Sequence, residues 1–401
     1  MSVLSGKKVL LGITAGIAAY KTASLVRLFI KRGAEVQVIM TPASKDFITP
    51  LTLSTLSKNP VHSTFYDKEA ENELWNNHVD LGLWADIMVI APATANTLSK
   101  MTNGVCDNLL LATYLSSKCP VYFAPAMDLD MYIHPSTKNN LDQLQHFGNV
   151  MIPATSGELA SGLVGEGRLA EPEDILSFIE KDLLNKLPLK GKKVLLTAGP
   201  TYEAIDPVRF IGNHSSGKMG FALAKKAANL GAEVILITGP SAETIQHSFV
   251  KRIDVKSAEE MYAQAHLYYK DTDIAILSAA VADYRPKNVA AQKIKKKEAT
   301  IEIVLEKTKD ILASLGEIKE HQLLVGFALE TNNEAENAKG KLKKKNLDLI
   351  VLNSLQDKGA GFATDTNKIT IIDKDLSMQT FDLKSKYAVA EDIMNAIVAK
   401  L

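Results

Sequence analysis

The hexapeptide Gly-Lys-Lys-Val-Leu-Leu occurs twice in the chain, at Gly6–Leu11 and at Gly191–Leu196. In each copy a short aliphatic run leads into a glycine-bearing turn, which is the pattern of a first strand in an α/β unit. The correspondence continues with Gly-Ala-Glu-Val at Gly33–Val36 and Gly231–Val234, each after a helical stretch and at the start of a second strand. The sequence therefore predicts two units with the same architecture.

Third strands are predicted at Asp86–Ile90 and Asp273–Leu277, and strands that alternate with helices favour parallel sheets covered on both faces. The two repeats are 33 − 6 = 27 positions apart in the first half and 231 − 191 = 40 in the second, a difference of 13 residues. The added residues fall in the first strand-to-helix connection, where such folds bind phosphates. We therefore expect the two units to bind different ligands.

The chain has 401 residues, which is enough for two domains. A helical stretch at Ile175–Leu187 ends at Pro188, and Lys190 leads into the second copy of the hexapeptide. We therefore expect α/β domains of the three-layer, Rossmann-like type at residues 1–188 and 189–401.

Lys plus Arg and Asp plus Glu both number 46, so no net charge attracts the protein to nucleic acid or to an anionic membrane. The two cysteines form neither a disulfide framework nor a metal-ligand motif. The N-terminus lacks an apolar signal core, and no apolar run approaches the roughly 20 residues that span a bilayer. These features predict a cytoplasmic protein without nucleic-acid or membrane partners.

In the first half, candidate ligand residues follow several predicted strands. Gly12 and Gly16 lie in the turn after the first strand, although a tight turn that binds nothing explains them equally well. Thr41 follows the second strand, and the small-residue loop Ala91–Thr97 follows the third. His78 precedes that third strand, where a surface or capping role is the alternative.

In the second half, the polar loop Asn213–Gly220 offers several donors at a predicted helix N-terminus, with a solvated loop as the alternative. We expect the third strand to continue through Ser278–Pro286, which would put Asp283 at its carboxyl end for a ribose, a base or Mg²⁺. An ordinary turn aspartate is the other reading of Asp283. Phe327 is suited to stacking on a base or to a core position.

Two lysine groups follow. The first begins at Lys293 and includes Lys295, Lys296 and Lys297. Such charge runs usually form a solvated face, and only its position soon after the predicted ligand edge favours a binding role. Lys341 and Lys345 are spaced i,i+4, which places both ammonium groups on one face of a helix.

These motifs carry a resemblance to known families. The first half resembles the homo-oligomeric flavin-containing cysteine decarboxylases at Gly16–Lys21, His78, Ala91–Thr97 and Pro125–Met127. The second half resembles phosphopantothenate–cysteine ligases. The strings that carry this second resemblance are Asn213–Gly220, Ala279–Pro286, Lys293–Lys296, Gly326–Asn333 and Lys344–Ile350. Together, the two halves resemble the bifunctional bacterial family of coenzyme A synthesis, which fuses the decarboxylase to the ligase.

For the N-terminal domain the resemblance implies a flavodoxin-like flavoprotein that uses FMN to decarboxylate phosphopantothenoylcysteine to 4′-phosphopantetheine. It assigns catalytic roles to His78 and to Asp128. The residues that it assigns to FMN are Gly16, Thr41, Ala93, Thr94 and Asn96.

For the C-terminal domain the resemblance implies ligation of cysteine to 4′-phosphopantothenate, with CTP forming an acyl-cytidylate and Mg²⁺ held mainly by the CTP phosphates; no metal ligands are assigned. Asn213 and Lys293 receive catalytic roles, and Arg209 a substrate-binding role. The residues assigned to CTP are Ala280, Asp283, Lys293, Asp310, Ile311, Phe327, Lys341 and Lys345. The family's Asn-Pro-Asp-Ile segment is Thr308–Ile311 here, so its first two residues differ.

Two further departures concern the decarboxylase. Asp128 replaces the asparagine of the family's Pro-x-Met-Asn motif, which exchanges an amide donor for an acceptor when the acid is ionised. Ser161 stands where the family's flap carries a proton-donating cysteine, and serine is a far weaker acid. Three hypotheses follow: a bifunctional enzyme, a working ligase with an impaired decarboxylase, or a flavin-binding scaffold that oligomerises the ligase. The family suggests homo-oligomers with trimeric flavoprotein units and dimeric ligase units.

Overall fold

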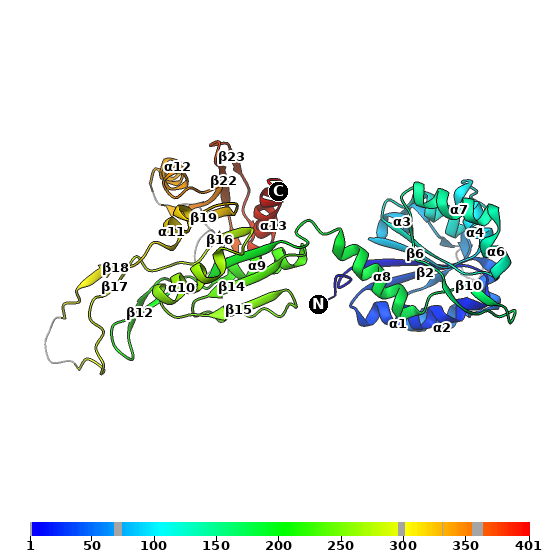
Figure 1. Cartoon of the computed structure of the whole chain (residues 1–401), viewed down its shortest axis with the longest axis horizontal. Coiled ribbons are helices and arrows are strands. Elements are labelled where there is room, and N and C mark those ends of the chain that lie inside the picture. Colours follow the sequence, from blue (N-terminus) through cyan, green and yellow to red (C-terminus); the bar gives the residue numbers. More distant parts are fainter. Residues whose placement is uncertain (1, 68–73, 296–300, 331, 355–363) are drawn as a thin grey trace. The chain divides into compact units, whose positions relative to one another are not determined.

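The computed structural model describes residues 2–67, 74–295, 301–330, 332–354 and 364–401. The chain forms two compact units, Met1–Asn185 and Lys186–Leu401 (Figure 1). The expected domain junction, between residues 188 and 189, lies three residues after the end of the first unit at Asn185. Lys296, Lys297 and Thr331, which belong to motifs singled out in the sequence, lie outside the described residues.

The first unit contains a six-stranded sheet in which all neighbouring strands are parallel. In spatial order, its strands are β3 (Val61–His62), β2 (Glu35–Met40), β1 (Lys8–Ile13), β6 (Ile87–Ala93), β7 (Val121–Pro125) and β8 (Val150–Met151). Without the two-residue β3, the order is that of flavodoxin-like sheets. Strands are added to one side of β1 up to β3 and to the other side from β6 onward, so the strand order reverses between β1 and β6. Ligands bind at such a switch point, beyond the carboxyl ends of the strands.

Helices cover both faces of this sheet. One face packs on α1 (Thr22–Lys31), α2 (Pro50–Ser57) and α8 (Pro172–Asn185). The other packs on α3 (His78–Trp84), α4 (Ala95–Thr102), α5 (Leu109–Ser116) and α7 (Pro135–His146). Shorter elements lie around the ligand edge: η1 (Ile17–Lys21), η2 (Pro42–Asp46), α6 (Leu129–Ile133) and the hairpin β9 (Thr155–Glu158)–β10 (Val164–Arg168). A separate antiparallel pair is formed by β4 (Tyr66–Asp67) and β5 (Leu74–Trp75).

The second unit contains an eight-stranded sheet. In spatial order, its strands are β15 (Val250–Asp254), β14 (Glu233–Thr238), β11 (Lys193–Ala198), β16 (Ile274–Leu277), β19 (Leu323–Glu330), β20 (Leu349–Ser354), β22 (Ile369–Asp373) and β23 (Met378–Thr380). The pairs from β15 to β20 are parallel, and β22 and β23 are antiparallel. The expectation of mostly parallel α/β sheets is confirmed in both units.

Helices again cover both faces. One face packs on α9 (Lys218–Asn229) and α13 (Lys386–Val398), and the other on α10 (Ala258–Tyr269), α11 (Ile311–Glu317) and α12 (Glu334–Lys344). Three two-stranded antiparallel sheets complete the unit: the hairpins β12 (Tyr202–Ala204)–β13 (Phe210–Gly212) and β17 (Tyr284–Pro286)–β18 (Leu305–Lys307), and the pair of β21 (Thr366–Asn367) with β24 (Lys384–Ser385). Among the helices of the described ranges, none is long and apolar enough to cross a bilayer.

The repeated hexapeptides have the same local structure. Gly6 and Gly191 both have left-handed backbones, with φ of 77° and 78°, at the turn before the first strand of each unit. Lys8 pairs with Glu35 in the first sheet, and Lys193 pairs with Glu233 in the second. The added residues of the second unit form the β12–β13 hairpin, between the first strand and α9.

Two local expectations are wrong. Gly12 belongs to β1 rather than to the turn, and a Cβ there would lie 2.5 Å from Cδ1 of Leu110, so this glycine allows α5 to pack closely. The third strand of the second unit ends at Leu277 and does not continue to Pro286. Asp283 lies instead in the loop before β17, because the residues after Leu277 bond to Thr197 and to the turn after β11 without continuing the strand.

Candidate functional site

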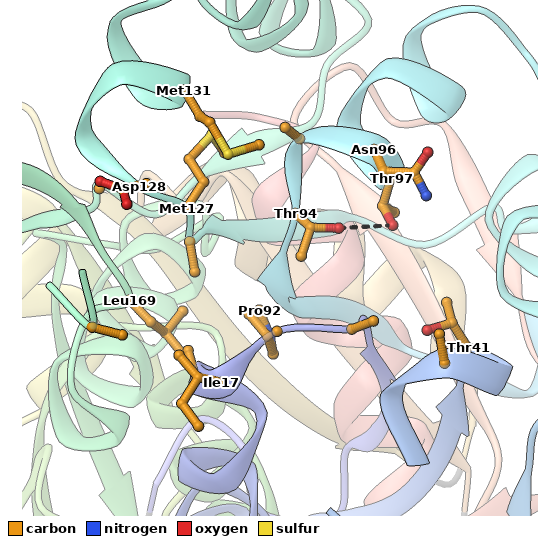
Figure 2. Close-up of a pocket in the computed structure, with 18 of the residues that line it drawn as sticks. Ile17, Thr41, Pro92, Thr94, Asn96, Thr97, Met127, Asp128, Met131 and Leu169 are labelled. Carbon is orange, nitrogen blue, oxygen red and sulfur yellow. Dashed lines mark hydrogen bonds between the residues drawn. The ribbon is translucent and has the colours of Figure 1, made fainter. Parts of the chain in front are cut away.

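A cavity of about 1050 Å³ lies at the carboxyl edge of the first sheet. Five of the predicted residues line it: Gly16, Thr41, Thr94, Asn96 and Asp128. In Figure 2, Thr41 and Asn96 lie on one side and Met127, Asp128 and Met131 on the other. Ala93, predicted for the same ligand, does not line the cavity; it is buried at the end of β6, where its carbonyl accepts from the Ala126 amide at 3.1 Å.

Hydroxyl groups hold the loop after β6 against β1. The Thr14 hydroxyl donates to the Pro92 carbonyl at 2.6 Å and accepts from the Thr94 amide at 3.2 Å. The Thr94 hydroxyl in turn donates to that of Thr97 at 3.3 Å (Figure 2). This loop leads into α4, whose first residues line the cavity. The hydrogen bonds of the loop therefore also fix the position of the first backbone amides of that helix.

The Thr41 hydroxyl is buried without a hydrogen-bond partner among the described residues, and its residue lines the cavity. A buried hydroxyl left unpaired costs free energy, so a polar ligand atom at this point would be stabilising. The cavity is of the size that holds cofactors, and its walls combine small side chains, hydroxyls and an amide. These residues fit a flavin mononucleotide.

Asp128 begins the short helix α6 and accepts from the Leu129 amide at 2.6 Å through Oδ1. Asp128 thus brings a carboxyl group to the cavity wall, where the asparagine of the family motif would bring an amide group.

The β9–β10 hairpin supplies another wall, with Ser161 in its turn. Gly167 anchors the hairpin, because its carbonyl accepts from the Met127 amide at 3.0 Å and a Cβ at this glycine would lie 2.5 Å from the Met127 carbonyl oxygen. Near its base, the buried Lys21 lines the cavity and pairs with Glu171 at 2.9 Å. The Lys21 hydrogen bond lowers the pKa of Glu171.

His78 is not brought to this cavity. It is the first residue of α3, and its ring lies edge-on to Phe65 with centroids 6.1 Å apart. Its Nδ1 is buried and has no hydrogen-bond partner in the described part of the chain.

In the second unit, cavities of about 150 and 520 Å³ lie at the carboxyl edge of the sheet. Both are lined by Ala279 and by the half-buried Phe327 of β19. The smaller cavity lies at the N-terminus of α9 and includes the predicted Ala280 together with the loop 215–220. The larger one includes four more predicted residues, Asp283, Asp310, Ile311 and Lys345.

In the larger cavity, Asp310 caps α11 by accepting from the Ala313 amide at 2.9 Å and pairs with Lys345 at 2.8 Å. Burial raises the pKa of Asp310, but the hydrogen bonds from Lys345 and Ala313 outweigh it, and the pKa is lowered overall. Thr308, at a departure from the family motif, donates through its hydroxyl to the Ala282 carbonyl at 2.6 Å and through its amide to the Asp283 carbonyl at 3.0 Å. It therefore holds the loop that carries Asp283.

Four predicted residues lie outside the walls of both cavities: Asn213, Arg209, Lys293 and Lys341. Asn213 is nevertheless adjacent, because its amide donates to the carbonyl of Ala280 at 3.0 Å. Lys341 pairs with Glu330 at 2.5 Å. Arg209 pairs with Asp206, and Lys293 is exposed.

Sequence reasoning missed three residues of the smaller cavity: Asn353, Asn367 and Lys386. Lys386 is buried at the start of α13 and donates to the Thr364 carbonyl at 2.6 Å. Burial and the nearby Lys218 lower the pKa of Lys386. No local motif distinguishes these residues; a polar residue near the end of β20 and a lysine at a capped helix start were the available signals.

Two lysines and the backbone amides at the start of α9 surround the smaller cavity, so it can accept an anion. Within the described ranges, no three His, Cys, Asp or Glu side chains are placed to hold a metal ion.

Family models match both units. A model described as "Flavoprotein" matches residues 2–184, and one described as "DNA/pantothenate metabolism flavoprotein C-terminal domain" matches residues 189–401.

Among curated proteins, a "Cysteine/Cysteine sulfinic acid decarboxylase" from an unknown prokaryotic organism is 54% identical over 356 residues, which cover 88% of this chain and 99% of that protein. The "Coenzyme A biosynthesis bifunctional protein CoaBC" of Bacillus subtilis is 44% identical over 399 residues, covering 99% of this chain and 98% of its own. The protein of that name from Vibrio cholerae is 45% identical over 400 residues, covering 99% of both chains.

Solved structures match each half. The C-terminal domain of a CoaBC protein is 43% identical and covers 54% of this chain and 98% of its own, with a TM-score of 0.46. A PPC decarboxylase mutant complexed with pantothenoylaminoethenethiol is 34% identical and covers 44% of this chain and 98% of its own, with a TM-score of 0.39.

Proposed function

Because the chain belongs to the family of coenzyme A biosynthesis bifunctional proteins, we propose that it carries both activities of that family. Residues 189–401 ligate cysteine to 4′-phosphopantothenate, and residues 1–188 decarboxylate the product to 4′-phosphopantetheine. The observation that carries this proposal is the presence of cavities at the carboxyl edges of both sheets, because a bifunctional enzyme needs a ligand site in each unit. A flavin-binding scaffold joined to a ligase would have the same cavities, and the products of the assay below distinguish the two.

In the N-terminal unit, the unpaired Thr41 hydroxyl and the small-residue walls support an FMN site. When bound, the flavin supplies an electron sink for the loss of the carboxylate. Thr41, Thr94 and Asn96 bind and orient it. Asp128 contacts the substrate, and the β9–β10 hairpin limits the access of water.

In the C-terminal unit, CTP activates the carboxylate of phosphopantothenate and cysteine then displaces CMP. The amides at the start of α9, with Lys218 and Lys386, stabilise negative charge in the smaller cavity. Asp283 and Lys345 bind the nucleotide in the larger one, and Phe327 lies between the two. Lys293 and Lys341 approach the phosphates from outside these walls, and Mg²⁺ is held mainly by CTP.

The assembly that we propose is a homo-oligomer with trimeric flavoprotein units and dimeric ligase units in the cytoplasm. The position of His78 supports it. His78 does not line the cavity of its own chain, and its buried Nδ1 has no partner among the residues described. In this assembly a neighbouring subunit would combine with His78 to form a shared decarboxylation site.

The test supplies phosphopantothenate, cysteine, CTP and Mg²⁺ and follows the products by mass spectrometry. We expect CMP, pyrophosphate and phosphopantetheine. Accumulation of phosphopantothenoylcysteine or its oxidised enethiol would indicate an impaired decarboxylase beside a working ligase. A lack of CMP release would contradict the ligase assignment.

A second candidate for the N-terminal unit is the decarboxylation of free cysteine or cysteine sulfinate. Two observations favour it: the relative with that printed name is 54% identical, and Asp128 and Ser161 depart from the phosphopantothenoylcysteine decarboxylase pattern. Competition between phosphopantothenoylcysteine and the two free acids distinguishes the candidates. Preferential formation of cysteamine or hypotaurine would support this second function.

A further inference from the structure

Asp206 lies at the tip of the β12–β13 hairpin with a fully buried carboxylate. Its Oδ1 accepts from the amides of Val208 and Arg209, both at 2.8 Å. Its Oδ2 accepts from Nε and Nη2 of Arg209 at 3.0 and 2.5 Å. These bonds hold the pKa of Asp206 well below its usual range, chiefly through Arg209.

The same pair holds a residue 88 positions away. The amide of Ile294 donates to Oδ2 of Asp206 at 3.1 Å, and the carbonyl of Ile294 accepts from Nη2 of Arg209 at 2.9 Å. Both backbone groups of one residue are thus bound by one ion pair. We refer to Asp206, Arg209 and the Ile294 backbone as the arm clamp.

The arm clamp holds the segment 287–295 near one end, and at the other end the Lys287 amide donates to the Val304 carbonyl at 2.9 Å. Residues 287–295 follow the β17–β18 hairpin's first strand, which projects from the body of the second unit (Figure 1). The turn of the β12–β13 hairpin also holds this segment, because the Ala290 amide donates to the Ile205 carbonyl at 3.0 Å. Lys293 and Lys295, on either side of Ile294, are exposed.

Because the amide and the carbonyl of Ile294 are both held, the backbone positions of its neighbours Lys293 and Lys295 are restricted as well. From this geometry we infer that Asp206 is a positioning residue for ligation, which acts through Lys293, and that Arg209 belongs to the same device. This inference rests on the proposed function for the role of Lys293, but the clamp itself can be tested without that role.

The first experiment measures tryptic cleavage after Lys293 and Lys295 in the folded, full-length protein by mass spectrometry. Asp206→Asn removes the charge that binds Arg209 and leaves an amide group facing the Ile294 amide, so we expect cleavage roughly tenfold faster or more. The matched control is Asp254→Asn, which breaks an exposed aspartate–arginine pair with Arg252 and should leave cleavage unchanged. Equal cleavage of Asp206→Asn and wild type would overturn the clamp, whatever the enzyme does.

The second experiment is a double-mutant cycle on KM for CTP, with Asp206→Asn, Lys293→Ala and their combination. If Asp206 acts through Lys293, each single change raises KM by roughly tenfold or more, and the combination is no worse than Lys293→Ala alone. A purely structural role would give additive effects and would raise KM for cysteine equally, and that result would overturn the inference.

Arg209→Lys provides a second variant if Asp206→Asn does not fold. It keeps the positive charge but cannot supply both the paired bonds to Asp206 and the bond to the Ile294 carbonyl. We expect the same changes with a smaller magnitude, and unchanged cleavage and KM would contradict the inference. If wild-type protein releases no CMP, the proposed function fails, while the cleavage experiment still decides whether the clamp exists.

Discussion

The Thr41 hydroxyl has no hydrogen-bond partner among the described residues, so its removal should affect the flavin-free and the flavin-bound protein differently. For Thr41→Val we expect FMN to bind roughly fivefold to tenfold more weakly, because one hydrogen bond is lost. The flavin-free protein should melt at the same temperature or higher, because a buried hydroxyl without a partner is replaced by a methyl group. Flavin fluorescence titration and thermal melting check both.

The control for this prediction is Thr55→Val, at an exposed threonine of α2 whose hydroxyl bonds to the Leu51 carbonyl. It should leave flavin affinity unchanged. A Thr41→Val protein that binds FMN as tightly as wild type would contradict the placement of the flavin against this hydroxyl.

The Lys21–Glu171 pair predicts a specific dependence of stability on pH. The pKa of Glu171 is lowered in the folded state from 4.5, first by the Lys21 hydrogen bond. A lowered folded pKa gives stabilisation that is present above 4.5 and is lost as pH falls through the folded value. Glu171→Gln removes the carboxylate that pairs with the ammonium of the buried Lys21. We therefore expect the free energy of unfolding at pH 7 to fall by about 1 to 3 kcal/mol.

Urea unfolding of the wild type and of Glu171→Gln at pH 7 and at decreasing pH tests this. The difference between the two proteins should narrow as pH falls below 4.5. The exposed Glu173→Gln, in the first turn of α8, is the control. A difference that stays constant down to the acid range would contradict the pairing.

The β9–β10 hairpin depends on a close approach at Gly167. Its φ of 132° lies in the left-handed region, and a Cβ would overlap the Met127 carbonyl oxygen. Gly167→Ala should therefore displace the hairpin from the cavity and slow decarboxylation roughly tenfold to a hundredfold, because small misplacements of a site wall are costly. Ligation should be unchanged, and separate assays of the two half-reactions measure the split.

Gly162→Ala is the matched control for the hairpin. Gly162 also has a positive φ, of 82°, but no atom lies within 4 Å of a Cβ there. It therefore carries the backbone strain without the overlap. Equal losses in the two variants would mean that strain, rather than the contact with Met127, explains the effect.

The same elements show how far a sequence predicts a fold. The strands around β1 and β11 were predictable because each is an aliphatic run in a repeated frame. The antiparallel β22 and β23 were not, because five- and three-residue strands carry little periodic signal. The apolar residues from Ser278 onward suggested a continuing strand, but hydrogen bonds to the turn after β11 hold them in a loop.

Candidate site residues could be predicted where polar groups follow a predicted strand, as at Thr41 and Asn96, or gather in one loop, as at residues 213–217. Lys386 and Asn353 reach the smaller cavity from chain segments far from that loop. Their convergence follows from the order of strands in the sheet and from the packing of α13 on α9, neither of which local sequence displays. His78 and Lys293, by contrast, were selected by motif and lie away from the cavity walls that the described residues form.

Each unit has its own hydrophobic core and its own cavities, so the two reactions should be separable within one chain. We expect Asp283→Ala, in the larger ligase cavity, to abolish most ligation and to leave decarboxylation of supplied phosphopantothenoylcysteine unchanged. The reverse is expected for Gly167→Ala. A mixture of the two variants should then convert phosphopantothenate to phosphopantetheine, because the intermediate can leave one site and diffuse to the other.

The mixing experiment compares the rate of phosphopantetheine formation by the mixture with that of each variant alone and of wild type at the same total concentration. With free diffusion, the mixture should reach about half the wild-type rate, since half the sites of each kind are intact. A mixture no faster than the slower variant would mean that the intermediate passes directly between sites of one assembly. The two units would then have separate hydrophobic cores but coupled reactions.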